Sequence, residues 1–469
     1  MNRGKSMSTN IIDFIINIVG KENVACKEGD LVCYSSDLAP LPETIIATYG
    51  VKDPSLIVRP KNSNHISEII KLANKEKIPV TPRGGACSSH GGGLPIDGGI
   101  VIDMTSMDKV LSIDAEDMYV YTQAGVTFAS LLSELSRNKL KLGCYPTSAP
   151  SATVGGYISN GGFAGIGAPL YGPIASHIMQ LEVVLPNGKI LSLNNPYSTF
   201  FVGTEGTMGV ITNVKLRVFP IPEFFKVMAF GFDDILSACY GLENLLKSQI
   251  KPYFLSFMDQ NFLEIMSKLG KCVPNYAMII FMALEGSKKS VEMQEKAINK
   301  VFSEGKQLPE AFGMEEWNNV HKNVLFIKRV GPTMVAIEVN LAVPNLKQAI
   351  KSLRDLNNKL GLNTCLYGLL GYGGSTLTMP IVLTDERRED EYFSTMLAAL
   401  KMTSVIISIG GSVYNIGLHN SLFMEHINDM KRLEIMRTLK KTFDPNKIMN
   451  PGKFTECRLA WLSSLISPR

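Results

Sequence analysis

The spacing of apolar and polar residues predicts alternating strands and helices in the first half of the chain. Residues 53–80 hold an apolar stretch, a turn, and then Ile66, Ile69, Ile70 and Leu72 at close to helical spacing, before a second short apolar stretch. This pattern predicts strand, helix and strand. Further on, the sequence predicts a strand over 98–105, a hairpin over 110–126, a helix over 127–138, a hairpin around Asn187-Gly188 over 178–191, and a strand over 210–222.

The pattern changes after residue 222. Helical stretches such as "DDILSACYGLENLLKSQ" (233–249) alternate with strand-like ones such as "YAMIIFMALEG" (276–286) and "MVAIEVNLAVP" (334–344). A long polar helix is predicted over 423–443. Because 469 residues exceed what one core usually holds, we expect two or three domains.

Composition and charge exclude several classes of protein. The net charge is +4 and the basic residues are scattered, so no nucleic-acid partner is indicated. No uninterrupted apolar run reaches the length of a membrane span, and Asp13 and Asn17 interrupt the apolar N-terminus. We therefore interpret residues 1–20 as an amphipathic first helix rather than a signal peptide, and we expect a cytoplasmic protein.

The eight cysteines form no CxxC pair, so neither a zinc ribbon nor an iron–sulfur cluster is indicated. We expect reduced thiols in a reducing compartment. A redox enzyme with this sequence would need an organic cofactor, and onward electron transfer would need a partner.

Two glycine-rich stretches are candidates for a binding site. They read "TPRGGACSSHGGGL" (81–94) and "TVGGYISNGGFAGIG" (153–167), and each follows a predicted strand. Such turns can direct several backbone N–H groups into one concavity and bind an anion such as a pyrophosphate. The Rossmann and P-loop patterns are both absent, so the anion site would belong to another architecture.

Four ordered motifs carry a family resemblance. They are "PVTPRGGACSSHGGG" (79–93), "YPTSAPSATVGGYISNGGFAGIG" (145–167), "FFVGTEGTMGVIT" (200–212) and "FDPNKIMNPGKF" (443–454). On these motifs the chain resembles the FAD-linked oxidases of the vanillyl-alcohol oxidase/p-cresol methylhydroxylase (PCMH) fold, within their glycolate oxidase/D-lactate dehydrogenase branch. The resemblance implies an α+β fold with a two-subdomain PCMH-type FAD-binding domain (1–222), an α+β cap domain with an antiparallel sheet (223–405), and a C-terminal segment (406–469) that returns to the FAD domain.

The resemblance also implies where FAD binds. The pyrophosphate would contact Arg83, Gly84, Gly85, Cys87, Ser88, Ser89, His90, Gly91 and Gly92. The ribityl and isoalloxazine side would be lined by Pro146, Thr147, Ser148, Thr153, Gly155, Gly156 and Asn160. The adenine end would be held by Glu205, Gly206, Gly209 and Ile211. Relatives with histidyl-FAD carry their histidine four residues after the arginine, and Cys87 occupies that place, so we expect FAD to be bound non-covalently.

The substrate motifs depart from the family. The family has the motif G-H-x-G-D-G-N-x-H, with two metal-ligating histidines, and this chain has "GLLGYGGST" (368–376) in its place. The two histidines are replaced by Leu369 and Thr376, and the aspartate and asparagine by Tyr372 and Gly374. Where the family has S-G-E-H-G-I-G, "GSVYNIG" (411–417) places Val413 and Tyr414 at the glutamate and histidine. We therefore expect no metal at the active site.

Alcohol oxidation needs a base for the hydroxyl proton, besides the flavin that takes the hydride. The candidates are Tyr414, Tyr372 and His419, with Lys328 or Arg329 as a cation that assists the base or holds a carboxylate. Each has a plain alternative: a packed aromatic ring for Tyr414, a solvated or capping histidine for His419, and a solvated surface for the Lys328–Arg329 pair.

Together these features predict an FAD-dependent dehydrogenase that oxidises a small 2-hydroxy acid. It would pass the electrons to a separate acceptor, for which we favour an iron–sulfur protein over a quinone. The alternative is a flavin-bearing electron-transfer subunit of a larger redox complex whose own substrate site is degenerate. The apolar stripe of the C-terminal tail is expected to pack on the body of the protein; it consists of Leu459, Trp461, Leu462, Leu465 and Ile466.

Overall fold

The computed structural model describes residues 7–42, 46, 50–426 and 430–456. The tail stripe at 459–466 lies outside these residues. The predicted first helix is α1 (Thr9–Val19), which buries Ile15 and Val19 and packs beside α4 (Ser63–Glu76). Among the described residues, no helix combines the length and the apolarity needed to cross a membrane.

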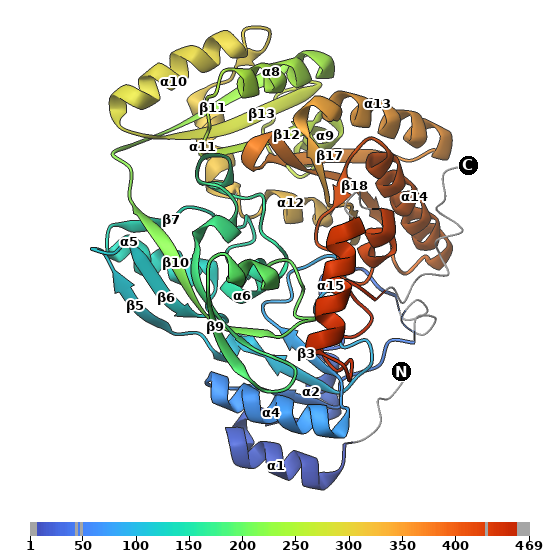
Figure 1. The fold of residues 1–469 in the computed structure, drawn as a ribbon. Helices are drawn as coiled ribbons and strands as arrows, with labels where there is room; N and C mark the ends of the chain where they lie inside the picture. Colours follow the sequence, from blue (N-terminus) through green and yellow to red (C-terminus); the bar gives the residue numbers. More distant parts are fainter. Residues whose placement is uncertain (1–6, 43–45, 47–49, 427–429, 457–469) are drawn as a thin grey trace.

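A small sheet at the base of the molecule leads into the first glycine-rich loop (Figure 1). Its strands lie in the order β1 (Val24–Ala25), β2 (Leu56–Val58), β4 (Ile100–Asp103) and β3 (Val80–Arg83), and the last three are parallel. Helix α4 buries Ile66, Ile69 and Ile70, as its apolar spacing predicts. Strand β3 ends at Arg83, so the first glycine-rich loop begins at the carboxyl edge of this sheet.

A second sheet forms the rest of the predicted FAD-binding half. Its strands lie in the order β5 (Val110–Asp114), β6 (Tyr119–Gln123), β10 (Val210–Pro220), β8 (Ile178–Val184) and β9 (Ile190–Asn194), and β7 (Leu140–Leu142) also pairs with β10. The hairpins predicted over 110–126 and 178–191 are β5–β6 and β8–β9. Helix α5 (Phe128–Arg137) precedes the second glycine-rich segment, which contains α6 (Val154–Ser159). The short α7 (Ala168–Tyr171) and η4 (Tyr197–Phe201) follow.

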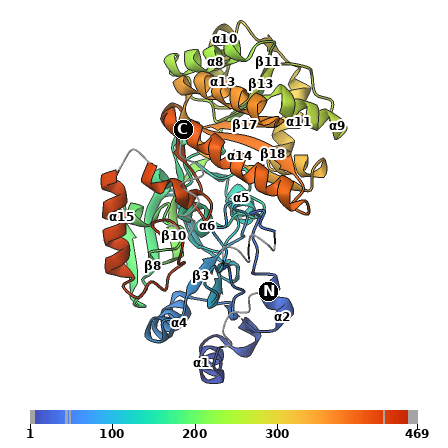
Figure 2. The same cartoon turned by 90° about the vertical axis from the view of Figure 1, so that its right-hand side faces the viewer.

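The cap is an antiparallel sheet between two layers. The described strands lie in the order β14 (Lys306–Gln307), β11 (Phe224–Phe232), β13 (Met278–Gly286), β12 (Phe254–Asp259), β17 (Thr364–Leu370), β18 (Ser375–Thr384), β16 (Val339–Ala342) and β19 (Ser412–Val413), and β15 (Thr333–Ala336) also pairs with β18. One face packs under α8 (Ile235–Lys247), α10 (Lys288–Val301), α13 (Val343–Leu360) and α14 (Glu389–Ser408). The other face meets α9 (Gln260–Lys268), α11 (Glu310–Asn319), α12 (Asn323–Phe326) and the FAD-binding half (Figure 2).

The stretch 334–344, predicted as one strand, is two. Strands β15 and β16 pair with β18 in a single register, but Ile337 and Glu338 lie between them. Ile337 N donates to Pro380 O over 3.0 Å, and Pro380 has no N–H to return the bond. The interruption therefore comes from a proline on the neighbouring strand, which the local pattern of residues 334–344 does not contain.

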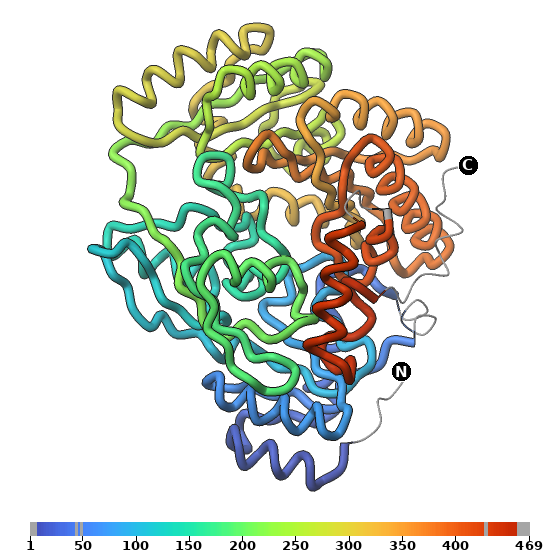
Figure 3. The backbone as a smooth tube through the Cα atoms, in the orientation of Figure 1, coloured from blue at the N-terminus to red at the C-terminus, as the bar shows by residue number. Residues whose placement is uncertain are grey.

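The C-terminal segment returns to the FAD-binding half after adding β19 to the cap sheet (Figure 3). The helix predicted over 423–443 consists of a 3-10 segment, η7 (Asn420–His426), and α15 (Met430–Phe443). Phe443 stacks on Phe201 at 6.2 Å. Val80 then bonds to Ile448 O over 2.7 Å and accepts from Asn450 N over 2.8 Å, so the chain end continues the edge of the small sheet.

A buried ion pair joins the two halves. Lys141 Nζ of β7 contacts both oxygens of Glu285 on β13, and the Tyr171 hydroxyl donates to Glu285 Oε1 over 2.6 Å. The ammonium also lies 3.8 Å from the centre of the Tyr253 ring. These contacts fix the cap against the FAD-binding half beside the cavity described next.

Candidate active site

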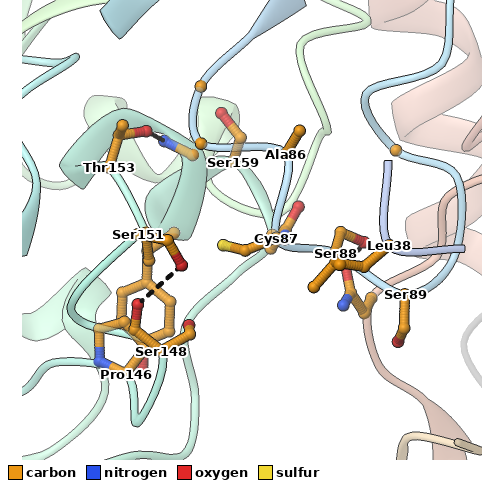
Figure 4. A pocket seen from close by; sticks show the side chains of 18 of the residues that line it. Leu38, Ala86, Cys87, Ser88, Ser89, Pro146, Ser148, Ser151, Thr153 and Ser159 are labelled. Atoms are coloured by element: carbon orange, nitrogen blue, oxygen red, sulfur yellow. Dashed lines mark hydrogen bonds between the residues drawn. The ribbon is translucent and has the colours of Figure 1, made fainter. Parts of the chain in front are cut away.

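One cavity lies between the FAD-binding half and the cap. Its lower wall contains both glycine-rich segments and residues 205–211. Its upper wall comes from the turn after α11, α12, β15, β17, β18 and the segment after β19. Figure 4 shows Ala86–Ser89 on one side and Pro146–Ser151 on the other. The predicted cofactor residues in the cavity wall are Arg83, Gly84, Gly85, Cys87, Ser88, Ser89, Gly92, Pro146, Thr147, Ser148, Thr153, Gly155, Gly156, Asn160, Glu205, Gly206, Gly209 and Ile211.

The first glycine-rich loop presents free backbone donors to this cavity. Within the described residues, the N–H groups of Gly84, Gly85, Ala86, Ser88 and Ser89 donate no hydrogen bond to the protein. Hydrogen bonds to the backbone fix the Arg83 guanidinium, which donates to the carbonyl oxygens of Ser36 (2.7 Å) and Gly93 (3.3 Å). The loop thus offers several unpaired N–H groups held in place by Arg83, which suits an anion.

A tight turn leads into the second glycine-rich segment, which begins with α6. Ala152 N bonds to Ser148 O over 2.9 Å, and Thr153 caps α6 by accepting from Gly156 N over 3.2 Å. Figure 4 shows the Cys87 sulfur turned toward Ser148 and Ser151 across the cavity. Burial raises the pKa of the Cys87 thiol, so this cysteine remains protonated.

Glu205 lies beneath the first loop as a buried link to the C-terminal segment. Its Oε2 accepts from Gly417 N over 2.7 Å, and burial raises its pKa to about 7. Lys453 is also buried, which lowers its pKa to about 7, and its Nζ donates to Gly92 O over 2.8 Å and to Asn450 Oδ1 over 2.8 Å. Lys453 thus holds the Gly92 carbonyl of the loop, and Glu205 connects the cavity wall to the C-terminal segment.

The cap contributes a buried carboxylate that reaches the first loop. Glu338 accepts from Ser89 Oγ over 2.9 Å and from Asn415 Nδ2 over 3.1 Å. Burial raises its pKa. Asn415 has a φ of 60°, a left-handed conformation that asparagine tolerates better than most residues. Since the family motif quoted above has glycine at this place, the conformation agrees with the alignment of 411–417 to that motif.

The cap also places an imidazole and a cation in the cavity wall. His321 follows α11, and its Nδ1 lies 2.8 Å from Thr147 O, in the turn before the second glycine-rich segment. Lys328, in η5 (Ile327–Arg329), lines the cavity from the same side and forms no ion pair with any described residue. No motif surrounds His321, so nothing in the sequence marks it as a site residue.

Comparison with known proteins agrees with the two halves seen in the structure. Residues 54–194 match the FAD binding domain family, and residues 221–454 match the C-terminal domain family of FAD linked oxidases. The chain belongs to the FAD-linked oxidases. It is therefore an FAD-dependent oxidoreductase, and the resemblance found in the sequence is confirmed.

Relatives and solved structures agree over nearly the whole chain. The glycolate oxidase subunit GlcD of Bacillus subtilis is 26% identical over 94% of this chain and 95% of its own, and a D-lactate dehydrogenase of Archaeoglobus fulgidus is 28% identical over 85% and 90%. The structure of p-cresol methylhydroxylase with substrate bound covers 97% of this chain and 99% of its own with a TM-score of 0.78 at 17% identity. The 4-ethylphenol oxidase of Gulosibacter chungangensis does so with a TM-score of 0.80 at 16% identity. The predicted α+β fold with its PCMH-type domain and antiparallel cap is thereby confirmed.

The residues of this FAD-linked oxidase fit the cofactor. The unpaired N–H groups of the first loop suit a pyrophosphate, and a Cβ added at Gly92 would meet nothing closer than 3.8 Å, which leaves open space at the loop surface. When bound, FAD supplies the hydride acceptor. The chain's own residues must bind the substrate and accept the hydroxyl proton.

Gly85 and Gly155 lack a side chain because their neighbours leave no room for one. Neither residue has a positive φ. A Cβ at Gly85 would lie 1.9 Å from Ser151 O, and one at Gly155 would lie 2.7 Å from the Ala124 Cβ. Both glycines therefore let the loops pack on neighbouring segments, which shapes the cavity indirectly.

Four predicted residues lie outside the cavity wall or away from a catalytic position. His90 and Gly91 face the C-terminal segment, where Leu418 N donates to His90 O over 2.7 Å. His419 is buried with its ring 6.4 Å from that of His90. Burial lowers the pKa of His419 to about 3 and that of His90 to about 4. Tyr372 is 49% exposed on the surface beside Lys251. The structure thus does not bring His419 or Tyr372 to the cavity.

Tyr414 does line the cavity, with its ring packed edge-on against Phe163 at 4.8 Å. Burial raises the pKa of its hydroxyl above the ordinary value near 10. At neutral pH this hydroxyl stays protonated, so it can donate a hydrogen bond but cannot accept a proton.

The places of the family's metal ligands hold a different arrangement. Leu369 presents an apolar side chain to the cavity, while Thr376 is buried and donates to Leu341 O over 2.8 Å. Among the described residues, no three His, Cys, Asp or Glu side chains are grouped as metal ligands would be.

Proposed function

We propose that the chain is an FAD-dependent dehydrogenase that oxidises a small 2-hydroxy acid and passes the electrons to a separate acceptor. The observation that carries this proposal is Lys328, which lines the cavity opposite the glycine-rich loops without an ion-pair partner among the described residues. A lysine ammonium can bind a substrate carboxylate by a charge-assisted hydrogen bond. The names of the glycolate oxidase subunit and of the D-lactate dehydrogenase support the same substrate class.

In this proposal FAD extends along the lower wall of the cavity. The first loop, at residues 83–85, 87–89 and 92, binds the pyrophosphate mainly through backbone N–H groups. Residues 146–160 line the ribityl and isoalloxazine side, and Gly206, Gly209 and Ile211 contact the adenine. Glu205 supports the cavity wall from beneath, because its carboxylate accepts a hydrogen bond from Gly417 N of the C-terminal segment.

The flavin is bound non-covalently. Cys87 occupies the place of the linking histidine in histidyl-FAD relatives, and its raised pKa leaves it without the thiolate that would attack. His90 is buried behind the loop. Acid precipitation of the yellow protein should release all flavin to the supernatant; flavin that remains with the pellet would overturn this part of the proposal.

The substrate site works without a metal ion. Leu369 supports this, because an alkyl side chain in the cavity cannot replace a liganding histidine. Dialysis against a chelator should leave the rate of flavin reduction unchanged. A stoichiometric divalent ion, with flavin reduction lost on its removal, would show that the motifs at 368–376 and 411–417 are misaligned.

We infer that the electron acceptor is an iron–sulfur protein. The relative from Bacillus subtilis is named as a subunit, which implies further chains in its complex. The described cysteines of this chain are free thiols, in keeping with a reducing compartment such as the cytoplasm.

Anaerobic addition of substrate tests the activity directly. Glycolate and each enantiomer of lactate, together with 2-hydroxy acids of longer side chain, should bleach the visible flavin band of the holoprotein. The matching alcohols without a carboxylate should not bleach it. A flavin that none of these acids reduces would refute the proposed substrate class.

A second candidate function is that of an electron-transfer subunit with a disused substrate site. The replacement of the family's ligands by Leu369, Thr376, Val413 and Tyr414 favours it. In that case hydroxy acids would leave the flavin oxidised, while a reduced partner protein would reduce it.

A further inference from the structure

We infer that His321 is the proton acceptor for the substrate hydroxyl in this chain. The inference rests on the proposed function and adds to it the residue that replaces the family's histidine, whose place Tyr414 occupies. Its starting point is that His321 lines the cavity on the cap side, with Nδ1 2.8 Å from the Thr147 carbonyl oxygen of the opposite wall.

This contact decides which tautomer the imidazole adopts. A carbonyl oxygen can only accept a hydrogen bond, so Nδ1 must carry the hydrogen. In a neutral imidazole Nε2 then has the free lone pair. Nε2 of His321 has no hydrogen-bond partner among the described residues, and it is not enclosed as Nε2 of His90 and His419 are. The ring thus presents an unprotonated nitrogen that the cavity contents can reach.

The other polar groups of the cavity are less suited to accept a proton. Glu205 lies at the adenine end of the proposed FAD placement, where it accepts from Gly417 N. Both oxygens of Glu338 already accept hydrogen bonds, from Ser89 and Asn415. The raised pKa of Tyr414 keeps its hydroxyl protonated. Lys328 is a cation that can only donate.

The segment that carries His321 is braced from within. Buried Glu316 of α11 accepts from Asn323 Nδ2 of α12 over 2.8 Å, which spans the turn holding His321. His321, Val324, Leu325 and Lys328 follow at helical spacing and all line the cavity. In this inference, a 2-hydroxy acid places its carboxylate at Lys328 and its hydroxyl near His321.

The oxidation step balances with these groups. The hydroxyl O–H bond breaks and its proton passes to His321 Nε2. The C–H bond of the same carbon breaks, and its hydride, with both electrons, passes to the oxidant, FAD. The carbinol carbon becomes a carbonyl, and the protonated His321 releases its proton to solvent.

Two substitutions separate proton acceptance from positioning. His321→Asn keeps an N–H donor for Thr147 O but has no basic nitrogen, while His321→Ala removes both and leaves space for free imidazole. Lys322→Ala, an exposed neighbour, is the control. The measured quantities are flavin content and the anaerobic rate of flavin reduction across a range of pH, with and without added imidazole.

We expect both His321 variants to keep their FAD and to lose on the order of 10²–10⁴ in the rate of flavin reduction, the range that general-base catalysis supplies. The fall of the wild-type rate at acid pH should disappear in both, and imidazole should partly restore His321→Ala but not His321→Asn. Unchanged rates and pH profiles would overturn the inference while leaving the proposed function intact.

A readout independent of turnover completes the test. Nitrogen-15 NMR of histidine-labelled holoprotein should show one signal of an unprotonated Nε2 that is absent from His321→Asn. A His321 protonated on Nε2 and bare on Nδ1 would refute the inference whatever the substrate. A wild-type flavin that no hydroxy acid reduces, with the tautomer as inferred, would refute the proposed function instead.

Discussion

Glu338 of the cap accepts a hydrogen bond from the Ser89 hydroxyl over 2.9 Å, across 249 residues of sequence. Ser89 belongs to the first glycine-rich loop, and Glu338 lies in the interruption between β15 and β16. The same carboxylate accepts from Asn415, whose Oδ1 accepts from Ser88 Oγ over 3.0 Å. The cap and the C-terminal segment therefore both hold the loop that lines the cofactor cavity.

Glu338→Gln should preserve this arrangement without the buried charge. A glutamine oxygen can accept from Asn415 while its amide donates to Ser89 Oγ. Because burial raises the pKa of Glu338, ionisation costs stability in the folded state, and this cost grows as pH rises above the ordinary carboxyl range. We expect the thermal midpoint of Glu338→Gln to exceed that of the wild type at pH 8 and to approach it near pH 4. A lower midpoint at pH 8 would show that the carboxylate has a charged partner.

The local parts of the fold could be predicted from the sequence, and the long-range parts could not. The hairpin at Asn187-Gly188 and the helix with Ile66, Ile69 and Ile70 depend on neighbouring residues, and both were predicted. The split at Ile337–Glu338 depends on Pro380 of another strand. The site shows the same division: the glycine-rich motifs located most of the cavity wall, whereas His321 acquires its significance from Thr147, 174 residues away.

Motif position alone misplaced one catalytic candidate. Tyr372 occupies a family ligand place, but Gly373 and Gly374 follow it with φ of 68° and 80°. The Tyr372 side chain lies on the surface, where it is 49% exposed. The position of Tyr372 in the motif therefore did not predict the direction of its side chain, because the metal ligands around it are replaced.

Gly85→Ala should destabilise the FAD-binding half itself. Its Cβ would lie 1.9 Å from Ser151 O, so the two loops would have to separate. Overpacking of this kind costs roughly 1–3 kcal/mol. Thermal unfolding of the apoprotein measures this loss. Gly92→Ala is the matched control, because its Cβ has space, and its apoprotein should unfold like the wild type. Equal midpoints for the two variants would contradict the packing role of Gly85.

Lys141→Met should weaken the junction between the FAD-binding half and the cap. It leaves the buried Glu285 carboxylate with the Tyr171 hydroxyl but without its cation. Removing one partner of a buried ion pair typically costs about 3–5 kcal/mol. The double variant Lys141→Met/Glu285→Gln should recover most of this loss in chemical denaturation. No recovery would show that the Lys141 stem, packed on Tyr253, matters more than its charge.

Lys328→Met should weaken substrate binding selectively, and its neighbour Arg329 provides the comparison. Arg329 is also exposed and cationic, but it lies outside the cavity wall, with its guanidinium 4.5 Å from the centre of the Phe326 ring. A hydrogen bond between charged groups contributes about 1.5–3 kcal/mol, which corresponds to roughly a 10- to 100-fold change in affinity. We therefore expect Lys328→Met to raise the KM for a 2-hydroxy acid by that factor and Arg329→Met to leave it unchanged. Both KM values are measured with an artificial electron acceptor, and flavin content should stay at the wild-type level in both variants. An equal effect of the two substitutions would point to the general positive potential at the cavity mouth and against a carboxylate held by Lys328.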